Sequence, residues 1–121
     1  VQYRLPVKVF ILNNLYMGMV RQWQELLHEG RYSHSYSDSL PDFVKLAEAY
    51  GATGIRASKP SELDAAIKKM IDTPGPVIFD CRVDQFENCY PMIPSGAAHN
   101  EMILGDDPEG ASVSEEGKML V

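Results

Sequence analysis

The chain has 121 residues, 45% of them hydrophobic, which is enough to form the buried core of one domain of ordinary size. Its formal net charge of −6 excludes nucleic acid and anionic membranes as main partners, because both are bound through clustered lysine and arginine side chains. The longest apolar stretch, Val9–Leu12, is too short to cross a bilayer, so we expect a cytoplasmic protein.

The first predicted element is a strand over Val7–Leu12, a run of β-branched and aromatic residues that follows Pro6. It stops at Asn13 and Asn14, because asparagine favours turns. The apolar side chains of this run are nearly continuous and do not alternate with polar ones. This pattern predicts a strand that is covered on both faces within a parallel sheet.

Three helices and two further strands are predicted along the rest of the chain. Apolar residues at three-to-four spacing predict helices over Met19–Glu29, Pro41–Tyr50 and Lys59–Ile71. Short apolar runs predict strands over Gly54–Ala57 and Pro76–Val83. This alternation of strands and helices predicts the α/β class, with a mainly parallel sheet and helices on both faces.

We expect residues 1–104 to form one incomplete α/β domain and residues 105–121 to form an acidic, flexible tail. Three strands make a thin sheet with an exposed edge, so we expect further strands upstream of Val1. The two cysteines, Cys81 and Cys89, lack the paired spacing of a zinc site. Cys81 lies within an apolar run and is expected to be buried.

The pair Asn13-Asn14 is the first candidate for a binding site. Ligands of open parallel sheets bind beyond the carboxyl ends of the strands, where this pair lies. An asparagine oxygen and nearby loop carbonyls can bind a hard cation such as Mg²⁺, which in turn can hold a diphosphate. On spacing alone, however, the pair is more simply explained as the end of a strand.

The sequence over Leu5–Asn14, followed by Gly18–Gln24, resembles the second half of the thiamine diphosphate motif, which opens with Gly-Asp-Gly and closes with Asn-Asn. The continuation Gly-Met-Val-Arg-Gln-Trp resembles acetolactate synthase (acetohydroxyacid synthase) large subunits in particular. The resemblance covers roughly residues 2–104 and implies an incomplete thiamine diphosphate-binding, flavodoxin-like domain. Further matching segments are Arg31–Ser35, Asp42–Ala47, Pro76–Cys81 and Pro91–Gly96.

The resemblance implies a metal site and a cofactor site near the end of the first strand. It implies that Mg²⁺ is bound by the side chain of Asn14 and by the backbone carbonyl of Tyr16. It also implies that Met17 and Gly18 lie against the cofactor diphosphate, where glycine permits close approach of the backbone. No residue of the chain is implied as a catalytic acid, base or nucleophile.

Met19 and Trp23 match positions that face the substrate cavity in this family. A flat indole there can pack against the extra methylene of 2-ketobutyrate. Their spacing alone favours a different interpretation. Together with Leu26 and Leu27 they form one apolar helical face, which is more typical of a helix packed into a core.

For the parent protein, the resemblance implies a transferase of branched-chain amino acid biosynthesis. Such an enzyme decarboxylates pyruvate on thiamine diphosphate and adds the remaining two-carbon unit to pyruvate or 2-ketobutyrate. Mg²⁺ and an FAD bound mainly outside this chain are the implied cofactors, and a homodimer or tetramer with a small regulatory subunit is the implied assembly. The Gly-Asp-Gly half of the motif does not occur in the 121 residues, so we expect the isolated chain to be inactive.

Two other functions remain open from the sequence. One is another carboligase of the same superfamily, such as glyoxylate carboligase, against which the pair Gln22-Trp23 argues. The other is a non-catalytic α/β interaction module that lacks the cofactor. A Gly-Asp-Gly about two dozen residues before Val7 would favour the enzyme, and a start codon near Val1 would favour the module.

Overall fold

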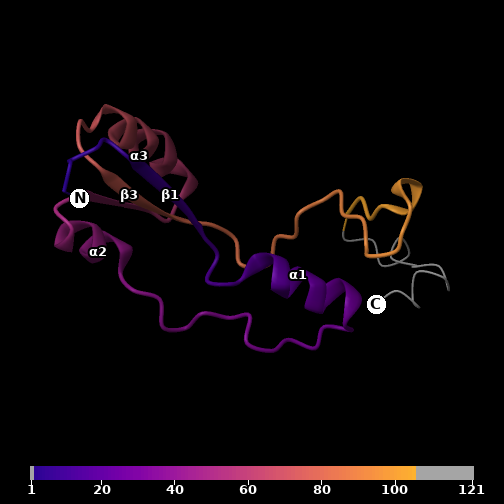
Figure 1. Cartoon of the computed structure of the whole chain (residues 1–121). Helices are drawn as coiled ribbons and strands as arrows, with labels where there is room; N and C mark the ends of the chain where they lie inside the picture. The colour runs from indigo at the N-terminus through magenta and orange to yellow at the C-terminus, as the bar shows by residue number, and fades with distance from the viewer. Residues whose placement is uncertain (1, 106–121) are drawn as a thin grey trace. The chain divides into compact units, whose positions relative to one another are not determined.

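The computed structural model describes residues 2–105. The chain divides into two compact units (Figure 1). Among the described residues, the sheet unit consists of 2–16 and 37–85, and the α1 unit consists of 17–36 and 86–105. Apart from Gly105, the predicted acidic tail lies outside the described residues. The division into a domain and a tail therefore stays a prediction.

The sheet unit contains three parallel strands, β1 (Lys8–Asn13), β2 (Thr53–Ala57) and β3 (Val77–Arg82), in the order β1-β3-β2. Each strand lies within one residue of its predicted position. The central strand β3 pairs with both neighbours, and its Phe79 lies opposite Phe10 on β1 and Ile55 on β2. The predicted parallel sheet is therefore confirmed.

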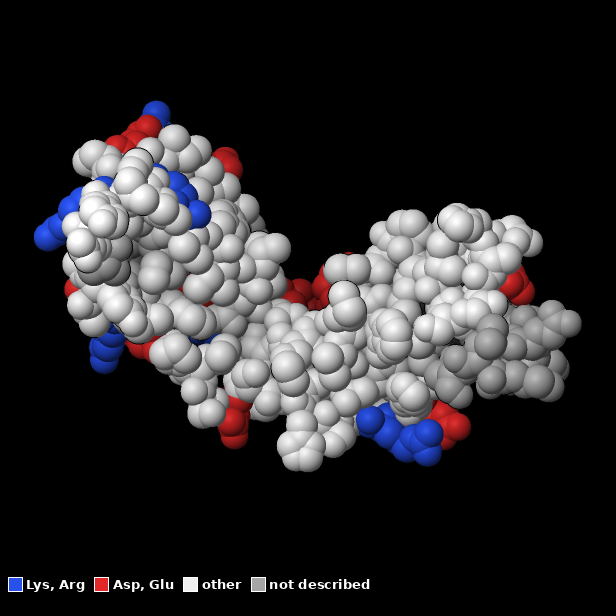
Figure 2. Space-filling view, viewed as in Figure 1, with Lys and Arg blue, Asp and Glu red and all other residues white. Residues whose placement is uncertain are grey.

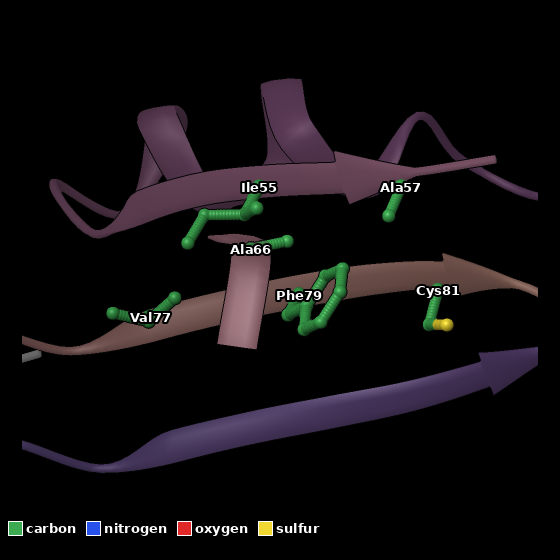
Figure 3. Close-up of a cluster of buried hydrophobic side chains, with 6 residues drawn as sticks. All are labelled: Ile55, Ala57, Ala66, Val77, Phe79 and Cys81. Atoms are coloured by element: carbon green, nitrogen blue, oxygen red, sulfur yellow. The ribbon is translucent and has the colours of Figure 1, made fainter. Parts of the chain in front are cut away.

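The apolar core lies between one face of this sheet and helix α3 (Pro60–Asp72). Three partly buried residues of α3 pack against it: Leu63, Ile67 and Met70. Removal of these side chains from water is the main stabilising contribution on this face. Cys81 is buried there, as predicted. Figure 3 shows the buried members of the cluster: Ile55, Ala57, Ala66, Val77, Phe79 and Cys81.

Helix α2 (Phe43–Ala49) packs on the opposite face of the sheet, so the prediction of helices on both faces is confirmed. Side chains alternate along a strand, so Gly54 points to the other face from Ile55. A Cβ atom placed on Gly54 would lie 2.8 Å from the Cα atom and carbonyl oxygen of Val44 in α2. Helix and strand backbones therefore touch here, and only glycine fits.

Strand β1 lies at the edge of the sheet and pairs only with β3 among the described strands. The prediction that its apolar run is covered on both faces is wrong for this chain. Val9 and Phe10 are exposed, and Leu12 is 68% exposed. Phe10 gains partial cover from Phe79, whose ring centroid lies 4.6 Å away in an edge-to-face arrangement.

The α1 unit contains helix α1 (Gly18–Leu27), the 3-10 turn η1 (His99–Glu101) and an antiparallel bridge between Met92 and Ile103. The predicted helix thus begins one residue earlier and ends two residues earlier than expected. Residues 2–105 contain no helix with the length and apolar character that membrane crossing requires.

We predict that Gly54→Ala destabilises the chain by about 1–3 kcal/mol, because the new methyl group would push α2 away from β2. Gly75→Ala is the matched control, since a Cβ atom at Gly75 meets no atom within 4 Å. Urea unfolding of the 121-residue chain measures both changes. Equal midpoints for the two variants would contradict the close contact between α2 and β2.

Candidate functional site

The chain turns at the carboxyl end of β1 through two consecutive asparagine turns. The Oδ1 atom of Asn13 accepts a hydrogen bond from the backbone N–H of Leu15 at 3.2 Å. The Oδ1 atom of Asn14 accepts one from the N–H of Tyr16 at 3.0 Å. Between them, Leu15 adopts a left-handed conformation with φ of 63°. The asparagine side chains offset the cost of this conformation, which is unfavourable for leucine.

The turn is anchored to the sheet through a buried acid. Asn13 donates from Nδ2 to Oδ1 of Asp80 on β3 at 2.8 Å, and the side chain of Asp80 is fully buried. The other carboxylate oxygen, Oδ2, accepts from Nε of Arg56 on β2 at 2.9 Å and pairs with Nε of Arg82 at 3.3 Å. These contacts compensate a charge that would otherwise be costly to bury.

Arg56 extends this network to the start of α2. Its Nη2 atom lies 2.9 Å from Oδ1 of Asp42, the N-cap residue of the helix. The hydrogen bond to Asp80 raises the pKa of Arg56 above its ordinary value. The N–H of Lys45 and the guanidinium of Arg56 lower the pKa of Asp42 below its ordinary value of 3.8. A connected polar network thus crosses the sheet from β1 to α2.

The carboxamide oxygen of Asn14 and a backbone carbonyl of this turn are suitable as some of the ligands of a magnesium ion. A carboxamide oxygen has two lone pairs. One lone pair of Oδ1 of Asn14 accepts the hydrogen bond from the N–H of Tyr16. The other lone pair is available to a hard cation, and a backbone carbonyl oxygen is likewise a ligand for hard cations. Within residues 2–105, no group of three or more His, Cys, Asp or Glu side chains is arranged to bind a metal. The described residues therefore fit part of such a site and not the whole of it.

Met17 and Gly18 form the beginning of α1. Met17 is the N-cap residue, its N–H donates to the carbonyl of Ser35 at 2.8 Å, and Gly18 opens the helix. No side chain caps this end, and its first turn carries no acid. The first N–H groups of a helix lack intrahelical acceptors and attract anions. This end of α1 is therefore chemically suited to a phosphate group.

Met19 and Trp23 are not core residues of this chain. Met19 is 75% exposed and Trp23 is 41% exposed, so the interpretation of these two residues as helix core is wrong, whereas Leu26 and Leu27 are half-buried. Figure 2 shows mostly uncharged surface over α1 on the face that it presents. The apolar side of α1 thus remains available for a ligand or another part of the protein.

The buried side of α1 is polar instead. The side chain of Gln22 forms two hydrogen bonds with the backbone of Cys89. It donates to the carbonyl at 3.0 Å and accepts from the N–H at 2.8 Å. Arg21 lies between the rings of Tyr32 and Phe86, with its Cζ atom 5.4 and 5.0 Å from the two ring centroids. These contacts attach the segment after residue 85 to the helix.

The six predicted site residues fall in both units of the chain. Asn14 and Tyr16 belong to the sheet unit, and the other four belong to the α1 unit. Sequence reasoning missed Asp80, Arg56 and the anchoring role of Asn13. A detectable signal did exist, because Asp80 is the only acid within the apolar run Val77–Cys81.

We predict that Gln22→Ala lowers the stability of the chain by about 1–3 kcal/mol, because it removes both hydrogen bonds between the Gln22 side chain and the backbone of Cys89, each worth about 0.5–1.5 kcal/mol. Met19→Ala should change stability by less than about 0.5 kcal/mol, as expected for an exposed side chain. Thermal unfolding of the two variants measures the difference. If Met19→Ala were the more damaging change, Met19 would have to be a core residue after all.

Comparisons with known proteins show the family to which the chain belongs. The family model described as thiamine pyrophosphate enzyme, C-terminal TPP binding domain, matches residues 1–81. The acetolactate synthase large subunit of Cyanidium caldarium is 48% identical over 103 residues, covering 84% of this chain and 18% of that protein. The corresponding subunit of Pyropia yezoensis is 45% identical over 114 residues, covering 93% and 19%.

A solved structure is also similar. It is the thiamine diphosphate-dependent 4-hydroxybenzoylformate decarboxylase of Rhodococcus jostii, with a TM-score of 0.63 and 30% sequence identity over 73% of this chain and 16% of that one. The chain spans about a fifth of the length of the curated relatives that it matches. On this evidence the chain belongs to the thiamine pyrophosphate enzymes, within their C-terminal TPP binding domain, and resembles acetolactate synthase large subunits.

Proposed function

We propose that this chain is the carboxyl-terminal part of an acetolactate synthase large subunit and supplies one part of its magnesium and thiamine diphosphate site. The observation that supports this most strongly is the turn over Asn13–Tyr16. It places an asparagine oxygen and a backbone carbonyl beyond the carboxyl end of a parallel strand. This is where open α/β sheets bind their ligands.

In this proposal Asn14 binds Mg²⁺ through its side-chain oxygen, and Tyr16 binds it through its backbone carbonyl. Mg²⁺ requires close to six oxygen ligands, so the rest must come from the diphosphate, from water and from an acid outside this chain. The aspartate of a Gly-Asp-Gly segment is the proposed source of that acid. Two neutral ligands are too few for tight binding, so the isolated chain should not catalyse the reaction.

Bound thiamine diphosphate would supply the electron sink that allows a 2-keto acid to lose carbon dioxide. The residues of this chain would bind and orient. Met17 and Gly18 would hold the diphosphate at the start of α1, and the exposed side chains of Met19 and Trp23 would line the acceptor site. Discrimination of 2-ketobutyrate from pyruvate by one methylene is worth about 1–3 kcal/mol.

The complete subunit, in the same proposal, condenses pyruvate with a second 2-keto acid in branched-chain amino acid biosynthesis. Identities of 45–48% to acetolactate synthase large subunits support this reaction over that of another carboligase. An FAD bound outside this chain, a homodimer or tetramer, and a small regulatory subunit belong to the proposal by resemblance. The oligomer would bring the exposed apolar residues of α1 and β1 next to further protein.

We predict that Asn14→Ala in the complete subunit weakens binding of Mg²⁺ and thiamine diphosphate by at least about tenfold and abolishes acetolactate formation, because a metal ligand is lost. Titration calorimetry measures binding, with the isolated chain beside the complete subunit. Asn100→Ala, at an exposed asparagine of η1, is the control and should bind normally.

Two results would contradict this proposal in different ways. Normal binding by Asn14→Ala would remove Asn14 from the metal site while leaving the enzyme assignment intact. Failure of the unchanged complete subunit to bind thiamine diphosphate would favour a non-catalytic interaction module instead.

A further inference from the structure

We propose that Asp80 is a positioning residue for the metal-binding turn, and that it acts through Asn13. Its buried carboxylate fixes the orientation of the Asn13 carboxamide, which holds the turn that presents the oxygens of Asn14 and Tyr16. This inference rests on the proposed function, because it assigns a role within the same site. It concerns residues of the sheet unit alone.

The geometry links the two residues across neighbouring strands. Asp80 on β3 lies in register with Ile11 on β1, and Asn13 follows two residues later on the same face. The Nδ2 atom of Asn13 lies 2.8 Å from Oδ1 of Asp80, and both side chains are buried. A bond between two buried side chains is shielded from competition with water.

The chemistry of the carboxylate determines which way Asn13 faces. A carboxylate only accepts hydrogen bonds, so Asn13 must present its NH₂ group to Asp80. Its oxygen then necessarily points the other way, where it accepts from the N–H of Leu15. A neutral amide at position 80 would lack this selectivity, because it can both donate and accept. Asp80 thus specifies the orientation that the turn requires.

The turn depends on that orientation because Leu15 is held with φ of 63°, a conformation that leucine rarely adopts. The bond from the Leu15 N–H to Asn13 is one of the contacts that maintain it. If Asn13 rotates its carboxamide, the Leu15 N–H faces a donor and the turn can relax. Relaxation would move the Tyr16 carbonyl, which directly follows, away from its position relative to the oxygen of Asn14.

The surrounding charges explain why an acid can occupy this place. Arg56 and Arg82 both contact Oδ2 of Asp80, at 2.9 and 3.3 Å, and leave Oδ1 to Asn13. The two guanidinium groups compensate the buried negative charge. A strand position that served packing alone would need neither an acid nor two arginines, since apolar residues of similar volume are often as stabilising.

The test compares variants of the complete subunit, with Mn²⁺ replacing Mg²⁺ so that free and bound metal are separated by electron paramagnetic resonance. With thiamine diphosphate saturating, Asp80→Asn should weaken Mn²⁺ binding about 10–100-fold, as substitutions of residues that orient metal ligands through hydrogen bonds commonly do. The Mg²⁺ concentration for half-maximal activity should rise in parallel, while kcat at saturating Mg²⁺ stays within about twofold of the unchanged enzyme.

Two further variants separate positioning from folding. Asn13→Ala keeps the ion pairs of Asp80 and removes only the link to the turn, so it should weaken Mn²⁺ binding to a similar extent even if Asp80→Asn fails to fold. Asp42→Ser is the matched control. It removes the carboxylate from the other end of Arg56, keeps a capping oxygen on α2 and should leave Mn²⁺ binding unchanged.

The inference is overturned if folded Asp80→Asn or folded Asn13→Ala binds Mn²⁺ like the unchanged subunit, or if Asp42→Ser weakens binding as much as Asn13→Ala does. Neither result would affect the proposed function, provided that the unchanged subunit binds metal and cofactor. If the unchanged subunit binds neither, the proposed function fails first and this inference fails with it.

Discussion

The buried carboxylate of Asp80, on the central strand, connects the three strands to one another at the carboxyl edge of the sheet. Asp80 accepts hydrogen bonds from Asn13 on β1 and Arg56 on β2, so one side chain links all three strands where parallel sheets bind their ligands. The opposite face of the sheet carries the apolar core beneath α3. The two faces of the sheet therefore contribute differently. The face under α3 supplies hydrophobic stabilisation, and the other face carries the ordered polar network that holds the turn after β1.

The α1 unit shows a similar use of polar contacts. Arg21 and Gln22 hold the helix against the segment after residue 85, whereas Met19 and Trp23 stay exposed. An amphipathic helix ordinarily buries its apolar stripe. In α1 two of the apolar side chains, Met19 and Trp23, stay exposed instead and are available to a ligand or to further protein.

Local patterns predict the strands and the sheet-packed helices to within about two residues, because each combines apolar periodicity with turn residues at its ends. They do not predict that β1 forms an edge, since strand order depends on pairing between distant segments. The buried face of α1 is missed for the same reason, because Gln22 finds its partner Cys89 67 residues away. Asp80 is detectable as an acid within an apolar strand, yet its partner Asn13 also lies 67 residues away.

The most direct test of the account is a crystal structure of the complete subunit with thiamine diphosphate and Mg²⁺. We expect the metal to lie about 2.0–2.1 Å from Oδ1 of Asn14 and from the carbonyl oxygen of Tyr16. The hydrogen bond between Asn13 and Asp80 should be intact in the same structure. A metal bound away from this turn, or an Asn14 side chain directed away from the cofactor, would contradict the account.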